Sequence, residues 1–308
     1  MSKFRNGGLF LLLSILWGTA FMVIKAGLEF VPPVLFAAFR YDIAGVVMLG
    51  YAASVSDHWK PKTRSDWTSV LVGATLIIGL YNAFLFVGQQ GVTSAVAAIL
   101  VAMNPILATG FARVFLPSER LTLVGSLGLL FGFIGVGLVA RPDPSNLLSG
   151  GLIFPGFVLL AAVCVALGSV LTQRVESDIS TEGMVAWSNA MGAVLLHGIS
   201  TSLPSESVTD VELTTGAILA VVYLAVFANA VGYFIYFDLL DQVGAIEINL
   251  VSYVAPVFAA VSGWVVLNES LDIVSIIGFI VIFVGFVLLK REAISSETDS
   301  IQLRNPSE

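Results

Sequence analysis

Two stretches of this sequence decide its fold, because each resembles the other. Residues 119–141 read ERLTLVGSLGLLFGFIGVGLVAR, and residues 269–291 read ESLDIVSIIGFIVIFVGFVLLKR. At a constant offset of 150, 8 of the 23 positions are identical, including the first glutamate, two glycines and the last arginine. Glutamate and arginine rarely coincide by chance in apolar sequence, so an internal repeat is predicted.

The sequence around these stretches is apolar along nearly its whole length. Of the 308 residues, 57% are hydrophobic and 11% are charged, whereas soluble chains carry about 25% charged residues. A soluble domain of this size would need more polar surface. We therefore expect an integral membrane protein without a separate soluble domain.

Apolar runs of about 20 residues are long enough to cross a bilayer as helices. Short polar breaks separate ten such runs, which predicts an all-α membrane protein of ten transmembrane helices. The predicted spans lie near residues 8–28, 33–54, 67–88, 92–115, 121–140, 150–173, 183–203, 213–237, 245–267 and 272–290. The first run is not expected to be a signal peptide, because it is too long and lacks a cleavage site.

The basic residues predict the orientation of these helices. With the N-terminus in the cytoplasm, eleven lysines and arginines fall inside, whereas Lys25 and Arg141 fall outside. We therefore expect a multi-pass protein of the plasma membrane with both termini in the cytoplasm.

The net charge and the cysteine content limit which binding partners and cross-links this protein is expected to have. The net charge is −7, and acidic residues gather at 204–212 and after Arg291. They fit either a high-salt environment or two solvated acidic segments. Cys164 is the one cysteine, which excludes an intrachain disulfide. Lipid and a small-molecule substrate are the expected partners; no cofactor, metal or nucleic acid is expected.

The repeat divides the chain into two halves of five helices. We predict a first repeat at residues 1–141, a second at 150–291 and a polar cytoplasmic tail at 292–308. Because five is odd, the second copy enters the membrane from the opposite side. Inverted repeats are typical of transporters, with the substrate near the midplane between the halves.

Short motifs recur in the same order in both halves. The first half carries LWGTAF at 16–21, PVLFAAFR at 33–40, SAVAAIL at 94–100, Asn104-Pro105 and SERLT at 118–122; the second carries YVAPVFAA at 253–260 and NESL at 268–271. Nearly the whole chain resembles the EamA family of the drug/metabolite transporter superfamily. The resemblance implies a ten-helix carrier that moves small organic metabolites, often outward. Ser118 and Asn268 stand where the family usually has glycine.

Polar and aromatic residues within the predicted helices are candidates for the substrate site. Such groups would lose free energy facing lipid, so we expect them to face the bundle. The candidates are Trp17, Asn82, Asn104, Trp187, Asn229, Tyr233, Tyr236, Asn249 and Tyr253. The helical spacing puts Asn229, Tyr233 and Tyr236 on one face, and Asn249 and Tyr253 on another. Packing between helices is the alternative role for each.

Charged residues inside the predicted helices have structural explanations as well. Arg40 is expected to be structural or to reach the interface, with a substrate carboxylate as the alternative partner. Asp42 lies on nearly the opposite face, and a proton-carrying role is its alternative. Glu119, Glu247 and Glu269 lie at helix starts, where the helix dipole favours acids.

Glycines in the two repeated stretches predict close helix packing. Gly128, Gly132 and Gly135 form a small-residue face, which Gly278 and Gly285 match in the second copy. The family resemblance implies that these helices join the halves or form a dimer contact. We expect a monomer or a homodimer.

The predicted function is secondary transport, because the sequence has no phosphate-binding loop that would use ATP. A membrane-embedded enzyme and a channel are the alternatives. His58 and His197 are the only histidines, and no metal-binding HExxH motif is present. No charged ring or selectivity loop supports a channel. Amides and aromatic rings suit amino acids, other zwitterions or amphipathic compounds.

Overall fold

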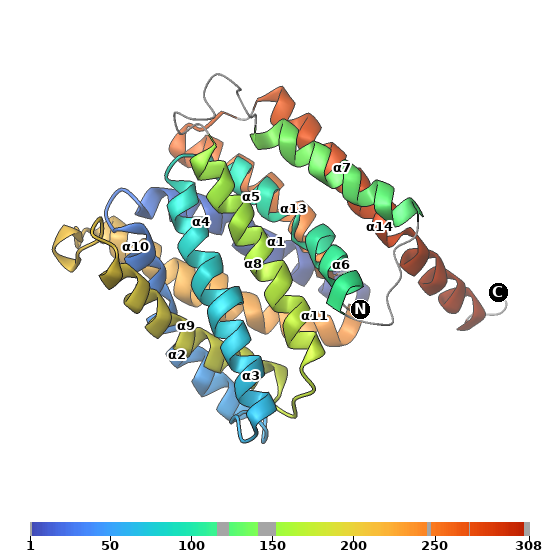
Figure 1. Ribbon diagram of the computed structural model, residues 1–308, viewed down its shortest axis with the longest axis horizontal. Coiled ribbons are helices and arrows are strands. Elements are labelled where there is room, and N and C mark those ends of the chain that lie inside the picture. The colour runs from blue at the N-terminus through green and yellow to red at the C-terminus, as the bar shows by residue number, and fades with distance from the viewer. Residues whose placement is uncertain (1, 116–122, 141–151, 245–247, 271, 305–308) are drawn as a thin grey trace.

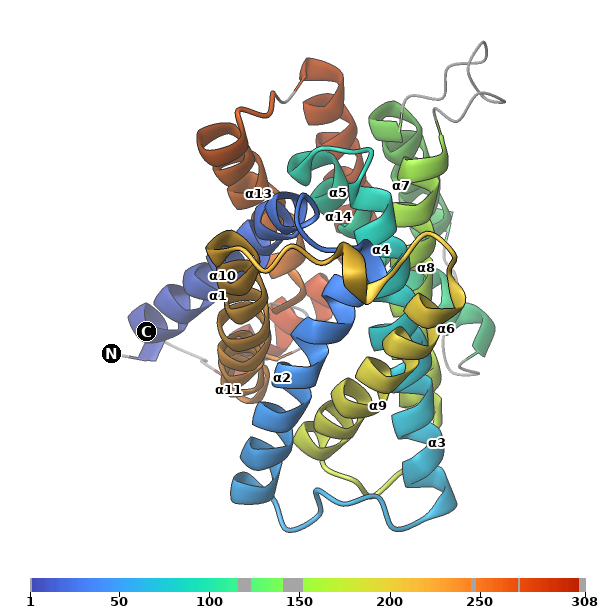
Figure 2. The same ribbon diagram turned by 90° about the vertical axis from the view of Figure 1, so that its left-hand side faces the viewer.

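The computed structural model describes residues 2–115, 123–140, 152–244, 248–270 and 272–304. Within these ranges the chain is built from helices and turns, without a strand. Figures 1 and 2 show the helices packed as a bundle, with α7 and α14 paired along one edge. Glu119, Arg120, Arg141 and Glu247 lie outside the described residues.

The first half contains the helices before residue 141. Their bounds are α1 Ser2–Gly27, α2 Pro33–Val55, α3 Arg64–Val72, η1 Gly73–Leu80, α4 Tyr81–Gln89, α5 Ser94–Val101, α6 Asn104–Phe115 and α7 Leu123–Ala140. The elements α3, η1 and α4 are continuous and form one rod, the first rod, at residues 64–89. A turn at Ala102–Met103 divides the predicted fourth span into α5 and α6.

The second half repeats this succession. Its bounds are α8 Ile153–Arg174, α9 Thr181–Ser202, a short 3-10 turn η2 Val208–Asp210, α10 Thr215–Val222, η3 Tyr223–Val231, α11 Gly232–Val243, α13 Val251–Leu267 and α14 Ile273–Arg304. The elements α10, η3 and α11 form the second rod, at residues 215–243. The helix α14 continues beyond the apolar run, into the segment predicted as a polar tail.

Hydrophobicity is distributed as a membrane requires. Among the residues that the structure describes, six helices or rods are long and apolar enough to cross a bilayer, and three shorter apolar helices accompany them. Large apolar side chains remain exposed on several helices, including Val46, Leu130, Val194, Trp264 and Ile280. Asparagines and serines are buried inside instead. Lipid, rather than water, is the solvent that suits this exterior.

Local sequence signals explain where the helices begin. Thr63, Thr93, Ser180 and Thr214 each accept a backbone N–H from the first turn of the following helix. Such caps satisfy backbone donors that have no partner within the helix. Proline occupies the first position of α2, where its missing N–H costs nothing.

The two repeated stretches pack against each other as α7 and α14. A Cβ atom at Gly135 would lie 2.7 Å from the carbonyl oxygen of Gly278, and one at Gly285 would lie 2.6 Å from that of Gly128. Only glycine permits this approach of the two backbones. The predicted packing face is therefore confirmed, and it joins the two halves within one chain.

Both rods contain a π-helical segment at the same place. The segments η1 at Gly73–Leu80 and η3 at Tyr223–Val231 begin 150 residues apart, the offset of the sequence repeat. A π turn inserts a residue and frees backbone carbonyls, and such turns are frequent at functional sites. Neither segment is visible from hydrophobic periodicity.

Glu269 has a different partner from the predicted one. Both of its carboxylate oxygens accept the N–H of Ser94, at 2.9 and 3.1 Å, so it caps α5. Asp272 instead accepts the N–H groups of Val274 and Ser275 at the start of α14. Glu269 is thus a structural residue, as predicted, but it caps α5 rather than the helix that follows it, because Asp272 lies one residue before α14 and caps that helix.

Candidate functional site

Three of the predicted site residues meet inside the bundle and form an aromatic cluster, Trp17, Tyr233 and Tyr236. The ring of Trp17 lies 5.8 Å from that of Tyr236 and 6.3 Å from that of Tyr233, between centroids. Tyr233 and Tyr236 also contact each other edge to face at 6.2 Å. Trp17 comes from α1 and the tyrosines from α11, so both halves contribute.

The π segment of the second rod fixes the position of Trp17. The indole Nε1 donates to the carbonyl oxygen of Ala228 at 3.1 Å, within η3. A Cβ atom at Gly232 would lie only 2.7 Å from this nitrogen, so glycine leaves the space for the indole ring. A buried indole N–H needs an acceptor, and η3 supplies it.

A pair of buried amides lies between α9 and the second rod. The Nδ2 of Asn189 donates to the Oδ1 of Asn229 at 3.1 Å, and both residues are almost fully buried. The Oδ1 of Asn189 and the Nδ2 of Asn229 have no hydrogen-bond partner. Buried amide atoms without partners are unfavourable, which makes this pair a candidate part of a polar site.

Asn189 is a residue that the sequence reasoning missed. It lies inside a predicted helix, eight residues from the start of α9, and the same criterion that selected Asn229 applies to it. The face shared by Asn229, Tyr233 and Tyr236 was also only partly right. The side chain of Asn229 bonds to Asn189 of α9, whereas the two tyrosine rings contact Trp17 of α1.

Asn82 anchors a second polar contact, between the first rod and α2. Its Nδ2 donates to the hydroxyl of Tyr41 at 3.1 Å and to the carbonyl oxygen of Ile78 at 2.8 Å. Its Oδ1 is buried without a partner. The neighbouring Gln89 donates to the carbonyl oxygen of Phe21 at 2.9 Å and so ties the first rod to α1.

Four predicted site residues lie apart from the aromatic cluster and the amide contacts, and two of them pack against other aromatic rings. Trp187 packs between Trp59 and Trp67, with ring centroids 6.3 and 5.8 Å away. Tyr253 packs against Phe283 and Phe286 of α14, and its hydroxyl is buried without a partner.

Among the described residues, the other two have no ring or hydrogen-bond contact that ties them to the aromatic cluster. Asn104 begins α6 with its Oδ1 buried and unpartnered, and Asn249 is half-buried before α13. The described contacts therefore connect the aromatic cluster and two amide contacts, and leave these four residues apart.

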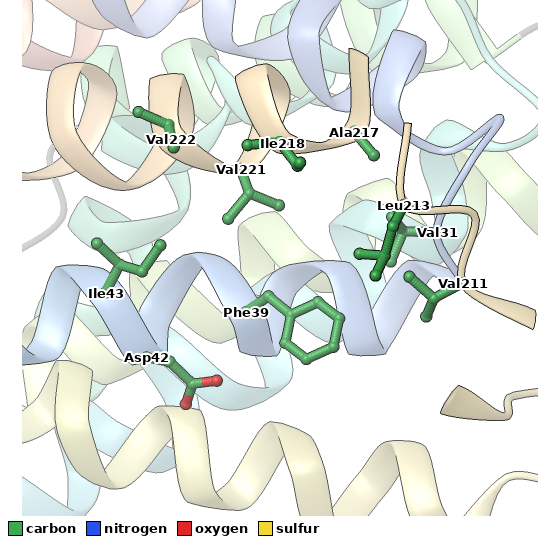
Figure 3. A pocket seen from close by; sticks show the side chains of 10 residues that line it. All are labelled: Val31, Phe39, Asp42, Ile43, Val211, Leu213, Ala217, Ile218, Val221 and Val222. Carbon is green, nitrogen blue, oxygen red and sulfur yellow. The ribbon is translucent and has the colours of Figure 1, made fainter. Parts of the chain in front are cut away.

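Asp42 pairs with the opposite half instead of with Arg40. Its Oδ2 lies 2.9 Å from the Nε2 of His197 on α9. Figure 3 shows Asp42 at the margin of an apolar groove of about 360 Å³ between α2 and α10, lined by Phe39, Ile43 and Val221 among others. Both side chains are partly exposed, and their contact joins α2 to α9.

Lys25 and Glu269 line a second pocket, of about 430 Å³, at the C-terminal end of α1. The Lys25 ammonium donates to the carbonyl oxygens of Gln89 and Gln90 at 2.9 and 3.0 Å. Together with the cap from Glu269 to α5, these bonds tie α1, the first rod, α5 and the turn before α14 together.

The apolar exterior, the helices and the buried polar contacts indicate a multi-pass membrane protein. Comparison with known families identifies it as a transporter. The model of the EamA-like transporter family matches residues 7–141 and, separately, residues 153–291. The chain therefore belongs to the EamA-like transporter family.

Relatives with similar length carry transporter names. The "Uncharacterized transporter YvbV" of Bacillus subtilis is 26% identical over 304 residues, which is 98% of this chain and 96% of the relative. The "Uncharacterized inner membrane transporter YedA" of Escherichia coli is 29% identical over 286 residues, 92% and 89% of the two chains. A solved crystal structure shares the fold, with a TM-score of 0.62 at 22% identity, over 94% of this chain and 98% of that one.

Proposed function

We propose that this chain is a secondary transporter that exports small organic metabolites, such as amino acids or amphipathic compounds, across the plasma membrane by alternating access. The aromatic cluster carries this proposal. It joins Trp17 of the first half to Tyr233 and Tyr236 of the second, well inside their helices. A substrate held there would contact both halves, as alternating access requires.

The chemistry around the aromatic cluster suits a zwitterionic or amphipathic substrate. Aromatic rings offer apolar surface with polar edges, and they bind cations over their faces. The unpartnered oxygens of Asn82 and Asn189 are acceptors for an ammonium or hydroxyl group. A rigid site that leaves polar atoms open favours ligands that can satisfy them.

Helix packing supports two inverted repeats of five spans. Counterpart helices pair with each other, α2 with α9 and α7 with α14. Other contacts recur with the halves exchanged: α1 packs on α13 as α8 packs on α6, and α4 packs on α8 as α11 packs on α1. A pseudo-twofold relation between the halves produces this exchange. The two separate family matches agree with it.

Capping carboxylates support the same relation. Glu206, before the second rod, accepts the N–H groups of Val34 and Leu35 at the start of α2, at 2.8 and 3.0 Å. Asp66, at the start of the first rod, accepts those of Asp178 and Ile179 just before α9, at 3.1 and 3.3 Å. Each half thus holds the start of a counterpart helix in the other half.

Transport is tested directly in proteoliposomes. The purified chain is reconstituted, and uptake and efflux of radiolabelled amino acids and amphipathic amines are measured with and without a pH gradient. Flux that saturates with concentration supports a carrier. Flux that rises without saturation would indicate a channel, and absence of flux across the whole panel would contradict the proposal.

Topology is tested by cysteine labelling. In a Cys164→Ala background, Lys60→Cys and Ser300→Cys should react only from the cytoplasmic side, and Ser205→Cys only from outside, with an impermeant maleimide. Labelling of Lys60→Cys and Ser300→Cys from different sides would overturn the inverted repeat with both termini in the cytoplasm.

A further inference from the structure

Arg40 is a charged side chain of α2 without an ion-pair partner among the described residues. It lies two turns into α2, and its Nε is buried and makes no hydrogen bond. Its guanidinium lies over the Tyr41 ring, 5.0 Å from the centroid. Within the described part of the chain no carboxylate forms an ion pair with Arg40, and the nearby Asp42 pairs with His197 instead.

The direction of the side chain argues against a purely interfacial role. The Nε of Arg40 is buried, so the guanidinium is not fully extended into solvent. Tyr41 beneath it is only 3% exposed, and the Tyr41 hydroxyl accepts from Asn82 of the first rod at 3.1 Å. Because α2 packs against both η3 and α4, Arg40 lies on a helix between the two rods.

The groups around Arg40 are neutral and partly unsatisfied. The hydroxyl of Tyr41 accepts from Asn82, which leaves its own hydrogen available to donate to a ligand. The Oδ1 of Asn82 has no partner. A positive charge in a membrane interior is unfavourable unless something neutralises it, and such a residue marks a substrate path.

We propose that Arg40 binds the carboxylate of the transported substrate, with the Tyr41 hydroxyl as a second donor. This inference rests on the proposed transport function and specifies its substrate class as organic carboxylates. The planar guanidinium matches a carboxylate with two parallel hydrogen bonds. One guanidinium neutralises one carboxylate, whereas a phosphate group with its charge of about −1.5 to −2 would remain partly uncompensated.

Chemical protection of Arg40 tests the site without transport. The purified chain in lipid nanodiscs is treated with phenylglyoxal, which modifies accessible guanidinium groups, and each arginine is quantified by peptide mass spectrometry. Saturating benzoate should slow modification of Arg40 about tenfold, as occupancy requires. Benzamide, which has the same shape without the charge, should not, and neither should inorganic phosphate at the same concentration.

The exposed Arg64 and Arg174 are internal controls, since benzoate should leave their modification unchanged. An Arg40 that never reacts is closed to small ligands, and equal protection by benzamide means that charge is not recognised. Either result overturns the inference. Protection by phosphate as strong as that by benzoate would overturn the choice of a carboxylate.

A transport assay distinguishes failure of this inference from failure of the proposed function. In proteoliposomes that transport a carboxylate substrate, Arg40→Gln should lower its flux about tenfold or more, while Arg40→Lys keeps the charge, controls for folding and retains part of the flux. Wild-type flux in Arg40→Gln would overturn the role of Arg40 and leave the transporter intact. Absence of flux in the wild-type chain would instead overturn the transport function, while the protection experiment still decides the carboxylate site.

Discussion

The two rods at residues 64–89 and 215–243 share a backbone and differ in their side chains. Both contain a π segment at the repeat offset of 150. The first rod has glycine at positions 73, 79 and 88, where the second has Tyr223, Asn229 and Asp238. At position 82 the relation is reversed, because Asn82 corresponds to Gly232.

The contacts that each rod makes reflect these differences between glycines and larger residues. The glycines of the first rod bring it against α8 and α9, where Gly73 meets Ser188 and Gly79 meets Leu195. In the second rod Tyr223 contacts the hydroxyl of Thr19 at 2.6 Å, Asn229 bonds to Asn189, and Asp238 pairs with Arg5 at 3.3 Å.

The two rods therefore have similar backbones and different roles. The first rod is chiefly a packing element that supports α8 and α9. The second presents polar and aromatic groups to the interior, and Gly232 makes room for Trp17. Substitutions at residues that differ between the two rods therefore test this difference in role.

The largest effect is expected when the packing of the first rod is broken at Gly88. A Cβ atom there would lie 2.9 Å from both the carbonyl oxygen of Phe154 and the backbone nitrogen of Val158. Because backbone atoms cannot rotate away, Gly88→Val should destabilise the protein by about 3 kcal/mol. Thermal unfolding in detergent and the yield of monodisperse protein measure this.

Gly50→Val is the matched control, because Gly50 of α2 has no atom within 4 Å of its Cβ position. It should unfold like the wild type. Equal stability of the two variants would show that the first rod does not depend on close packing against α8.

The capping carboxylates that flank the rods should differ in strength. Asp66 is only 3% exposed and accepts four backbone N–H groups, whereas Glu206 is half-buried and accepts two. Asp66→Asn should cost about 2 kcal/mol of stability, and Glu206→Gln about 1 kcal/mol. The unfolding temperatures of the two variants, measured under the same condition, rank the two losses of stability. A larger loss for Glu206→Gln would mean that burial does not determine how much each capping carboxylate stabilises the protein.

Substitution of the aromatic cluster should affect transport and spare folding. Tyr233→Ala removes a ring that contacts Trp17 and Tyr236, and the half-saturating substrate concentration should rise about tenfold, equivalent to about 1.4 kcal/mol. The proteoliposome flux assay measures it.

Phe84→Ala is the counterpart in the first rod, where Phe84 stacks on Phe157 with ring centroids 5.9 Å apart. It should lower stability and leave the half-saturating concentration unchanged. An equal rise in both variants would remove the distinction between a packing rod and a binding rod.

The smallest effect is expected for the amide pair. A double-mutant cycle of Asn189→Ala and Asn229→Ala should give a coupling of about 0.6 kcal/mol, the average for hydrogen bonds between membrane helices. The cycle of Asn82→Ala and Tyr41→Phe applies the same measurement to the first rod. Additive effects at Asn189 and Asn229 would mean that their contact contributes nothing.

The class of the protein could be predicted from the sequence because each helix carries its own signal. A run such as 153–174 must be helical and apolar to cross lipid, whatever its neighbours are. The caps at Thr63 and Ser180, the glycine face of 128–135 and the family motifs are local in the same way. The boundaries of α2 and α9 followed within a few residues.

The site could be predicted only in part. Residues such as Trp17, Asn82 and Asn229 were identified because polar groups are expensive in lipid, which is a property of the residue type. Their partners Ala228, Tyr41 and Asn189 depend on which helices meet. Trp187 and Tyr253 met the same criterion and contact other aromatic groups instead.

By itself the sequence determined a membrane-embedded helical transporter with a repeat at an offset of 150. Only the tertiary structure decided which polar groups face one another. Each residue added to a helix turns the following side chains by about 100°, and a π turn adds one residue without an apolar signature. The bond between Asn189 and Asn229, the contact of Tyr233 with Trp17 and the pairing of Asp42 with His197 therefore depend on how the helices pack together.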